Sequence, residues 1–258
     1  MLEAFHRDGI VVLEGLPTHD EDEWVNATRR AFLTLVPMRL HAQVTEDAYW
    51  HTGDASRPNY NDYTNEGRQV TEQVTLTADG ATKPEHPGWY GGALKLHQDG
   101  CYTPAPPRLK MYAPWGDAVT STFADGRRAI SSLPDSSAGA LREAAVTVTY
   151  EGRHAATAPV LRTDGTMCFN PGDACTVERA NASDVAGGRA LDELAALLGD
   201  SDLHLKVPAG TGMAFVVDNT RVLHGRIGQV AGRRRVVGGE APAGAVAERW
   251  AEVARVDG

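Results

Sequence analysis

The sequence predicts a mainly β protein with flanking helices, whose core is an antiparallel sandwich or jelly roll. Short extended runs separated by turn residues fill most of the chain beyond residue 93, and 27 glycines and 14 prolines are available for the turns. Helical patterns are few, and they do not alternate with the strands as they do in proteins built from βαβ units. Many short strands joined by Gly- and Pro-containing turns are typical of antiparallel two-sheet folds.

The N-terminal third is predicted to contain two strands, one helix and two irregular stretches. Residues 9–15 and 70–76 are β-rich runs. A helix is predicted over 20–36, because acidic residues open it and apolar residues recur at helical spacing until a proline ends the pattern. Residues 40–65 are polar and aromatic without periodicity, which predicts a long insert or lid, and 83–92 are irregular.

Most of the predicted strands lie beyond residue 93. They cover residues 94–97, 108–112, 119–123, 146–150, 167–169, 203–207, 213–217, 221–224 and 235–237. Three helices interrupt them, at 138–145, 190–198 and 245–253; the second is followed by Gly199, a favourable C-terminal stop.

Length and composition favour one soluble domain spanning residues 1–258, with its jelly-roll core at about 90–240. The net charge of -9 and the lack of a basic stripe argue against nucleic-acid binding. No stretch approaches the roughly 20 apolar residues of a membrane span. Three scattered cysteines and an N-terminus unlike a signal peptide indicate the reducing cytoplasm. The expected partner is therefore a small molecule, and the oligomeric state is left open.

Two histidines and a carboxylate form a candidate metal site. His97 and Asp99 stand two apart after an apolar run, so that in an extended chain their side chains leave the same face. His224 ends a second short extended run far downstream. Two histidines and one carboxylate on one face of a metal, with the opposite face open, are the ligand set of non-haem iron(II) oxygenases. A His-x-Asp tripeptide alone is weak support, since a lone histidine is more often a surface or core residue.

The surrounding sequence resembles a known family. Residues 96–102 (LHQDGCY), followed by 106–109 (PPRL), resemble the first metal motif of the taurine dioxygenase and γ-butyrobetaine hydroxylase (clavaminate synthase-like) family. Residues 215–226 (FVVDNTRVLHGR) are similar to its second motif, which is the more specific one. The resemblance is good over 89–239 and looser before it. It implies a double-stranded β-helix that uses iron(II), 2-oxoglutarate and O2, with metal ligands at the three positions above.

The resemblance also implies an arginine that binds the distal carboxylate of 2-oxoglutarate, a short distance after the second histidine. Arg235, eleven residues past His224, best fits the family pattern, and Arg233 is the reserve choice on the same face of an extended strand. A guanidinium suits this role because it binds a carboxylate through two parallel hydrogen bonds. Two arginines of the run 233–235 are then expected to be solvated.

A hydroxyl residue of the family bonds the same cosubstrate, and here its place falls on Ser121, with Thr122 and Thr120 as neighbours that leave the assignment open. The family's Gly-Gly-x-Thr run is not present in this form, so the sequence departs from the family at this contact and not at the metal site. The C-terminus also lacks the family's closing basic segment, which predicts a different substrate lid.

Substrate contacts can be named only as candidates, since aromatic residues are more often core than contact residues. The candidates are Tyr60, Asn61, Tyr63, Trp89, Tyr90, Tyr102, Asn219 and Arg226. Cys101, two residues past Asp99, is interpreted as a small buried hydrophobic residue.

The function expected from the resemblance is oxidation of a small polar metabolite, such as an amino acid or another carboxylate, with release of succinate and CO2. Asp99 favours oxygen transfer over halogenation, because related halogenases have a small residue at this position. Desaturation, epoxidation and cyclisation require the same machinery and stay open. Two alternatives are a zinc-dependent hydrolase with the same three ligands and a non-catalytic jelly-roll metal-binding protein.

Overall fold

The computed structural model describes residues 2–35, 50–51, 72–76, 93–150, 152, 154–172, 175–228 and 234–241. Its strands are β1 (Ile10–Glu14), β2 (Trp50–His51), β3 (Glu72–Leu76), β4 (Leu94–His97), β5 (Leu109–Trp115), β6 (Val119–Asp125), β7 (Ala145–Tyr150), β8 (His154–Pro159), β9 (Cys175–Arg179), β10 (His204–Ala209), β11 (Met213–Asp218), β12 (Val222–Ile227) and β13 (Arg234–Ala241). Its helices are α1 (Leu2–Asp8), α2 (Glu21–Leu35), α4 (Gly126–Ser131), α5 (Asp135–Glu143) and α6 (Val185–Gly199), with a 3₁₀ turn at Ser201–Leu203.

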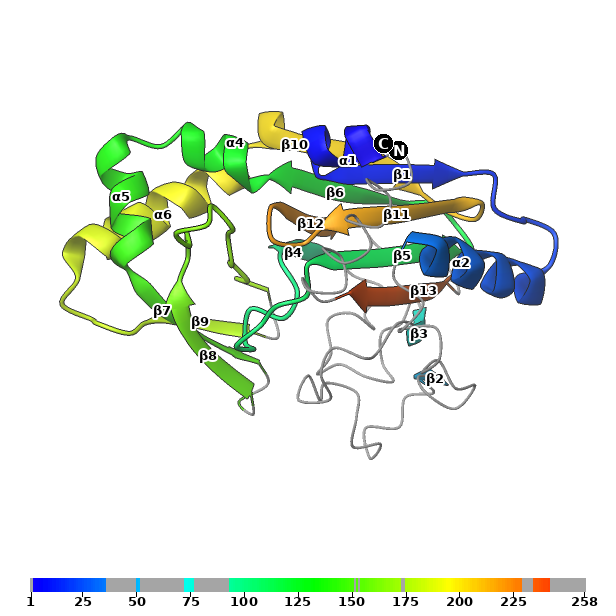
Figure 1. Cartoon of the computed structure of the whole chain (residues 1–258), viewed down its shortest axis with the longest axis horizontal. Coiled ribbons are helices and arrows are strands. Elements are labelled where there is room, and N and C mark those ends of the chain that lie inside the picture. The colour runs from blue at the N-terminus through cyan, green and yellow to red at the C-terminus, as the bar shows by residue number, and fades with distance from the viewer. Residues whose placement is uncertain are drawn as a thin grey trace, which may run out of the picture.

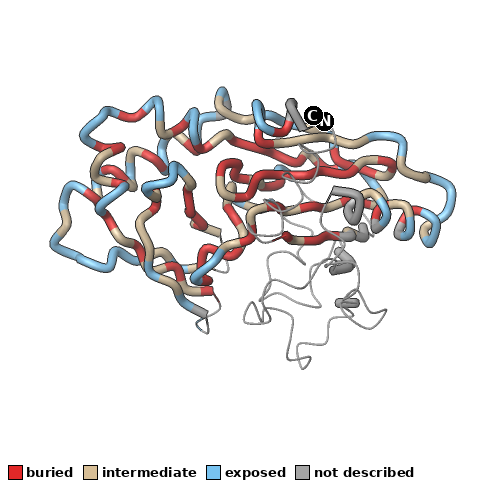
Figure 2. The backbone as a smooth tube through the Cα atoms, viewed as in Figure 1, coloured by how far each residue is buried: buried red, intermediate tan, exposed pale blue. Residues whose placement is uncertain are grey.

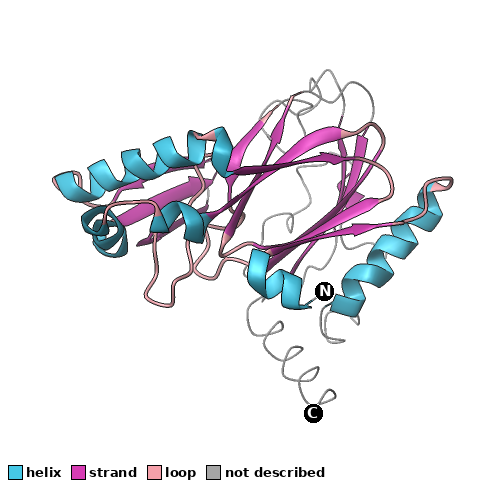
Figure 3. Ribbon diagram, turned by 90° about the horizontal axis from the view of Figure 1, so that it is seen from above, coloured by secondary structure: helices cyan, strands magenta, loops and turns pink. Residues whose placement is uncertain are grey.

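Two sheets build the part of the fold that carries the predicted metal ligands (Figures 1 and 3). One has the strand order β1-β11-β5-β13-β3-β2 and the other β10-β6-β12-β4. Apolar side chains from both sheets meet between them in one buried cluster, made of Phe123, Ala209, Phe215, Val217 and Val222. The pairs within both sheets are antiparallel except β2 with β3. The prediction of a mainly β fold with a jelly-roll core is confirmed.

Helix α2 covers the outer face of the larger sheet (Figure 3). Its Trp24 is fully buried and packs against Trp115 of β5, with ring centroids 5.3 Å apart. Because side chains alternate along a strand, the positions of β5 that share a row with Trp115 face this helix. The other row of β5, Lys110 and Tyr112, faces the interior, where Tyr112 stacks on Phe215.

A third sheet, β8-β7-β9, lies beside helices α5 and α6 at the opposite end of the molecule from α2 (Figure 1). It has its own buried cluster, which includes Leu141, Val148, Leu194 and Leu223. Leu223 comes from β12, so this second cluster reaches the strand that carries His224. Figure 2 shows that buried residues are concentrated along the central strands of the molecule, with partly buried residues between them.

The predicted strands were largely confirmed, but not all of them. Residues 167–169 do not form a strand; they contain only an isolated bridge from Met167 to Leu161. The segment is apolar because it is packed into the core, and the amide of Phe169 donates to the side chain of Gln98 instead of to a strand. Strands β8 and β9 and helices α1 and α4 were not predicted; β8, for example, is rich in alanine, which is depleted in strands. The predicted irregular segment 83–92, the helix at 245–253 and, apart from β2, the insert at 40–65 lie outside the described residues.

The cysteines depart from the expectation of an unpaired set. Cys101 is buried as predicted, yet it forms a disulfide with Cys168, and Cys175 is free. The loop after Asp99 packs against the segment that precedes Phe169, and a separation of 67 residues gives no hint of this proximity in the sequence. Within the part of the chain that the structure describes, no helix is both long and apolar enough to span a membrane.

Candidate metal centre

The three predicted metal ligands meet at neighbouring strands of the smaller sheet. His97 is the last residue of β4, Asp99 follows it in the turn, and His224 lies in β12. The antiparallel pairing of β4 with β12 places His97 directly opposite His224. A ladder contact therefore joins two residues that are 127 positions apart in the sequence.

The geometry of the three side chains suits one metal ion. Nε2 of His97 lies 3.5 Å from Oδ1 of Asp99, and Nε2 of His224 lies 3.4 Å from Oδ2. The potential ligand atoms of all three residues lie within 4.8 Å of one another. Ligands about 2.1 Å from a metal at right angles to each other are about 3 Å apart, so the two contacts of Asp99 need little adjustment, and the imidazoles need a modest approach to bind the same ion. The side chains are 12–21% exposed, which leaves an approach for further ligands.

Hydrogen bonding fixes which nitrogen of His97 is available to a metal. Its Nδ1 donates to the carbonyl oxygen of Lys95 at 2.7 Å, so Nε2 carries the lone pair and points to Asp99. Nδ1 of His224 is buried without a hydrogen-bond partner among the described residues.

Burial and mutual contact shift the pKa values of all three groups. Burial alone would raise the pKa of Asp99, but the charge of Lys110 and contacts with the two histidines hold it well below its usual value. Burial is also the largest influence on His97, yet the hydrogen bond and charge of Asp99 raise its pKa above the usual 6.5. The pKa of His224 is lowered, first by burial and then by the charge of His97. The site thus holds an ionised carboxylate and a neutral imidazole ready to bind a cation.

A buried amide network joins the two ligand-bearing segments. The Asn219 side chain accepts from the amide of Asp99 (2.9 Å) and donates to the carbonyls of Asp99 (2.9 Å) and Pro107 (3.0 Å). Gln98 donates to the carbonyl of Asn219 (2.7 Å) and accepts from the amide of Phe169 (2.9 Å). Both amide side chains are only 1% exposed, so buried hydrogen bonds hold the turn that carries Asp99 in place.

A lysine from the facing sheet completes the surroundings of Asp99. Nζ of Lys110 lies 3.1 Å from Oδ2 of Asp99 and 2.9 Å from Oε1 of Glu240. Glu240 lies directly opposite Lys110 in the pairing of β13 with β5. Sequence reasoning missed this lysine, since no local spacing links it to the metal motifs.

A comparison with protein families now identifies the arrangement. The family described as "Taurine catabolism dioxygenase TauD, TfdA family" matches residues 1–239. The chain belongs to this family. The resemblance inferred from the two motifs is confirmed, and the chain is a non-haem iron(II)- and 2-oxoglutarate-dependent dioxygenase. TauD/TfdA membership decides against the zinc-hydrolase and non-catalytic alternatives. The His–Asp–His donor set fits iron(II), because its three ligands leave three coordination positions for a bidentate 2-oxo acid and O2.

Solved structures of iron oxygenases share the fold. An asparagine oxygenase in complex with Fe(II), 2S,3S-3-hydroxyasparagine and succinate is 18% identical, with a TM-score of 0.61 over 92% of this chain and 77% of that chain. The non-haem iron oxygenase OrfP is 16% identical, with a TM-score of 0.63 over 93% and 79%. PvcB from Pseudomonas aeruginosa is 14% identical, with a TM-score of 0.59 over 93% and 78%. No curated protein matches the sequence.

The predicted hydroxyl residues lie beside the metal strand. β6 pairs with β12 so that Ser121 is opposite Arg226 and Thr122 is opposite Gly225. By strand alternation Ser121 and Arg226 belong to the row that carries His224, whereas Thr122 belongs to the other row. Ser121, Thr122 and Arg226 are all buried. Ser121 is therefore better situated than Thr122 to face the metal.

The predicted cosubstrate arginine falls at the start of β13. Arg235 lies opposite Trp115 in the ladder between β13 and β5, and Arg233 lies outside the described residues. By strand alternation, position 235 therefore falls in the row of Trp115, on the side of α2, and position 234 falls in the row of Glu240, on the side of the metal ligands. The assignment of Arg235 stays a prediction.

The eight substrate candidates divide into five outside the described residues and three within them, of which the buried Arg226 has been placed above. Tyr60, Asn61, Tyr63, Trp89 and Tyr90 lie outside the described residues. Tyr102 is buried and stacks on Tyr150 of the third sheet, with ring centroids 4.5 Å apart. The Asn219 side chain is occupied by the hydrogen bonds given above, which makes it a support of the metal turn.

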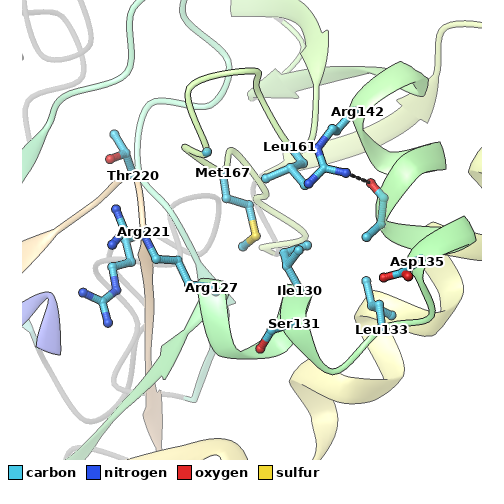
Figure 4. Close-up of a pocket in the computed structure, with 13 residues that line it drawn as sticks. Arg127, Ile130, Ser131, Leu133, Asp135, Arg142, Leu161, Met167, Thr220 and Arg221 are labelled. Carbon is cyan, nitrogen blue, oxygen red and sulfur yellow. Dashed lines mark hydrogen bonds between the residues drawn. The ribbon is translucent and has the colours of Figure 1, made fainter. Parts of the chain in front are cut away.

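A separate cavity of about 370 Å³ lies between α4, α5 and the turn that precedes β12 (Figure 4). Apolar side chains such as Ile130 and Met167 line it, together with Arg142. The side chain of Arg221, at its edge, is paired with Asp125. None of the three metal ligands lines this cavity.

Proposed function

We propose that the enzyme hydroxylates, or otherwise oxidises by hydrogen abstraction, a small polar metabolite such as an amino acid or another carboxylate, with release of succinate and CO2. The observation that carries this proposal is the convergence of His97, Asp99 and His224 within 4.8 Å in a member of the TauD/TfdA family. When bound, iron(II) supplies the centre at which 2-oxoglutarate, O2 and the substrate are brought together.

The protein groups around the centre support the binding of a charged cosubstrate. The distal carboxylate of 2-oxoglutarate requires a fixed cation, and on the family pattern we assign this role to Arg235, with Arg233 as the second choice. Position 234, which shares the row of Glu240 in the ladder, is the competing position. Ser121, in the same row as Phe123 and opposite Arg226, is the hydroxyl assigned to the cosubstrate, ahead of Thr122.

A polar substrate is supported by the character of the site and by one relative. Two charged side chains of the larger sheet lie at the metal ligands, with Lys110 against Asp99 and Glu240 against Lys110. The asparagine oxygenase of the same fold was solved with a hydroxylated amino acid and succinate. Substrate contacts are proposed from Arg226 and from the segments that hold Tyr60, Asn61 and Tyr90.

Two measurements test the function. The first adds Fe(II) and 2-oxoglutarate to the protein without O2 and looks for a weak visible charge-transfer band. The second incubates the iron-loaded enzyme aerobically with a panel of amino acids and other small carboxylates, and scores succinate formation coupled to loss of the candidate substrate. H97A, D99A and H224A are each expected to abolish the band and turnover while keeping a native circular dichroism spectrum.

Either of two results would refute the proposal. One is a wild-type protein that binds Fe(II) but never develops the band with 2-oxoglutarate. The other is substantial oxidation by all three alanine variants, because the three side chains would then not be the metal ligands. R108A is not a suitable control here, since Arg108 is paired with Asp218 next to the metal turn. K206M, a change at an exposed lysine of β10, is the matched control.

A further inference from the structure

Lys110 is a largely buried ammonium that contacts two carboxylates among the described residues, one of them a metal ligand. Its side chain is 15% exposed and contacts Asp99 at 3.1 Å and Glu240 at 2.9 Å. It lies on the interior row of β5, where its neighbours Val217 and Tyr112 belong to or pack on the apolar cluster between the sheets. A buried charge is costly unless it is well paired, so an apolar residue would fit this row at lower cost. The lysine therefore has a reason to be there other than packing.

The contact with Asp99 is made to one carboxylate oxygen. Oδ2 of Asp99 is the atom that Lys110 contacts, and it also lies 3.4 Å from Nε2 of His224, while Oδ1 lies 3.5 Å from Nε2 of His97. A carboxylate can occupy one or two coordination positions of a metal. In this enzyme only one is available to it, since two histidines, a bidentate 2-oxo acid and O2 require the other five. A fixed N–H donor on one oxygen favours the mode that uses a single oxygen.

We propose that Lys110 is a positioning residue for the metal site: held by Glu240, it engages one oxygen of Asp99 so that this ligand takes up a single coordination position and leaves room for the 2-oxo acid. This inference rests on the proposed function, because it assumes that iron and 2-oxoglutarate bind at His97, Asp99 and His224.

Glu240 has a second effect, on charge. Asp99 alone carries one negative charge, and adding Lys110 alone would bring the local sum to zero and weaken the attraction for a cation. With Glu240 the three side chains again sum to minus one. Lys110 and Glu240 together therefore orient Asp99 and leave the summed charge of the three side chains at minus one. The two partners should then have opposite effects on metal affinity when each is removed.

The test is a double-mutant cycle with K110M, E240Q and K110M/E240Q, with K206M as the control at an exposed lysine. Two constants are measured for each protein. The Kd for Co(II) comes from its visible absorption, and the Kd for 2-oxoglutarate comes from the charge-transfer band with Fe(II) in the absence of O2. Neither readout requires turnover or a known substrate.

E240Q is expected to weaken Co(II) binding by about 10-fold or more, in the range typical of residues that support metal ligands. K110M is expected to bind Co(II) at least as tightly as wild type, because two carboxylates then face the metal, but to bind 2-oxoglutarate about 10-fold more weakly. The double variant is expected to recover wild-type Co(II) affinity and to keep the weak 2-oxoglutarate binding. K110R, which keeps the charge and the donor, should restore part of the 2-oxoglutarate affinity.

The proposal is overturned if K110M changes neither constant by more than threefold, or if it weakens both to the same degree, which would mean that Lys110 only supports the fold. If K110M does not fold, E240Q decides: an unchanged Co(II) constant refutes the charge argument. A wild-type protein that shows no band with 2-oxoglutarate would instead refute the proposed function, so the two failures are told apart.

Discussion

Substituting Asn219 by alanine should destabilise the protein and loosen the metal site together. The side chain is 1% exposed and makes three hydrogen bonds, with the amide and the carbonyl of Asp99 and with the carbonyl of Pro107. N219A leaves these three backbone groups without their partner. At about 1–3 kcal/mol for each buried unsatisfied group, and allowing for partial replacement by water, the loss is about 3–5 kcal/mol. Domains are stable by only about 5–15 kcal/mol, so this is a large fraction.

The metal affinity should fall at the same time. Asp99 is a proposed ligand, and both hydrogen-bonding groups of its peptide unit lose their anchor in N219A. Supports of this kind are typically worth about 10–100-fold in metal affinity. N219D should do no better than N219A, because its carboxylate would face the carbonyl oxygens of Asp99 and Pro107, to which the amide group donates.

Urea unfolding with and without Co(II), and direct Co(II) titration, measure both effects. N181A is the matched control, because Asn181 is exposed and, among the described residues, its side chain bonds within its own turn, to Ser183. The reasoning is refuted if N219A unfolds within 1 kcal/mol of wild type and keeps the wild-type Co(II) affinity. A loss of stability with unchanged metal affinity would show that the turn holds its shape without this amide.

Three further predictions concern the cosubstrate, the disulfide and pH. R235A should raise the 2-oxoglutarate requirement by about 30-fold or more, since removing the charged partner of the cosubstrate carboxylate is expected to cost at least about 2 kcal/mol. A larger effect of R234A would assign the cosubstrate cation to the other row of β13, and steady-state kinetics or titration of the charge-transfer band distinguishes the two. Replacing Cys101 and Cys168 by serine should lower the free energy of unfolding by up to about 4 kcal/mol, which is the loop-closure contribution expected for a disulfide that spans 67 residues. Urea unfolding curves of the wild-type protein that do not change on addition of reductant would contradict this prediction. The pKa of His97 is raised above 6.5, so metal binding must release a proton from this imidazole when it is charged. The affinity for Co(II) should therefore fall as the pH is lowered through that raised pKa. An affinity that is constant between about pH 6 and 8 would contradict this prediction.

The metal ligands could be predicted because their arrangement is partly local. His97 and Asp99 are two positions apart at the end of a strand, so strand geometry alone brings them together. His224 required the long second motif, since nothing in the sequence states that β12 pairs with β4. The direct pairing of His97 with His224 is a result of the sheet topology.

The groups that support the ligands could not be predicted, because contacts between distant segments of the chain bring them together. Lys110 and Glu240 are 130 residues apart, and Cys101 and Cys168 are 67 apart. Each pair depends on which strands or loops become neighbours, and a single sequence carries no periodicity that reports this. Gln98 could have been recognised, because an amide that alternates with two ligands on a strand end must point into the protein and find buried partners.

The distribution of these groups over the two sheets implies that metal binding and folding are coupled. The ligands come from β4 and β12 of the smaller sheet, while Lys110 comes from β5 of the larger sheet. The turn holding Asp99 is fixed further by Asn219, which follows β11 of that larger sheet. A metal can therefore meet its full set of supported ligands only when the two sheets are packed together. A ligand that binds only the folded state stabilises it by about 2.7 kcal/mol at 100 times its Kd. This stabilisation should be smaller in any variant that frees Asp99 from the larger sheet, even when all three ligands are retained.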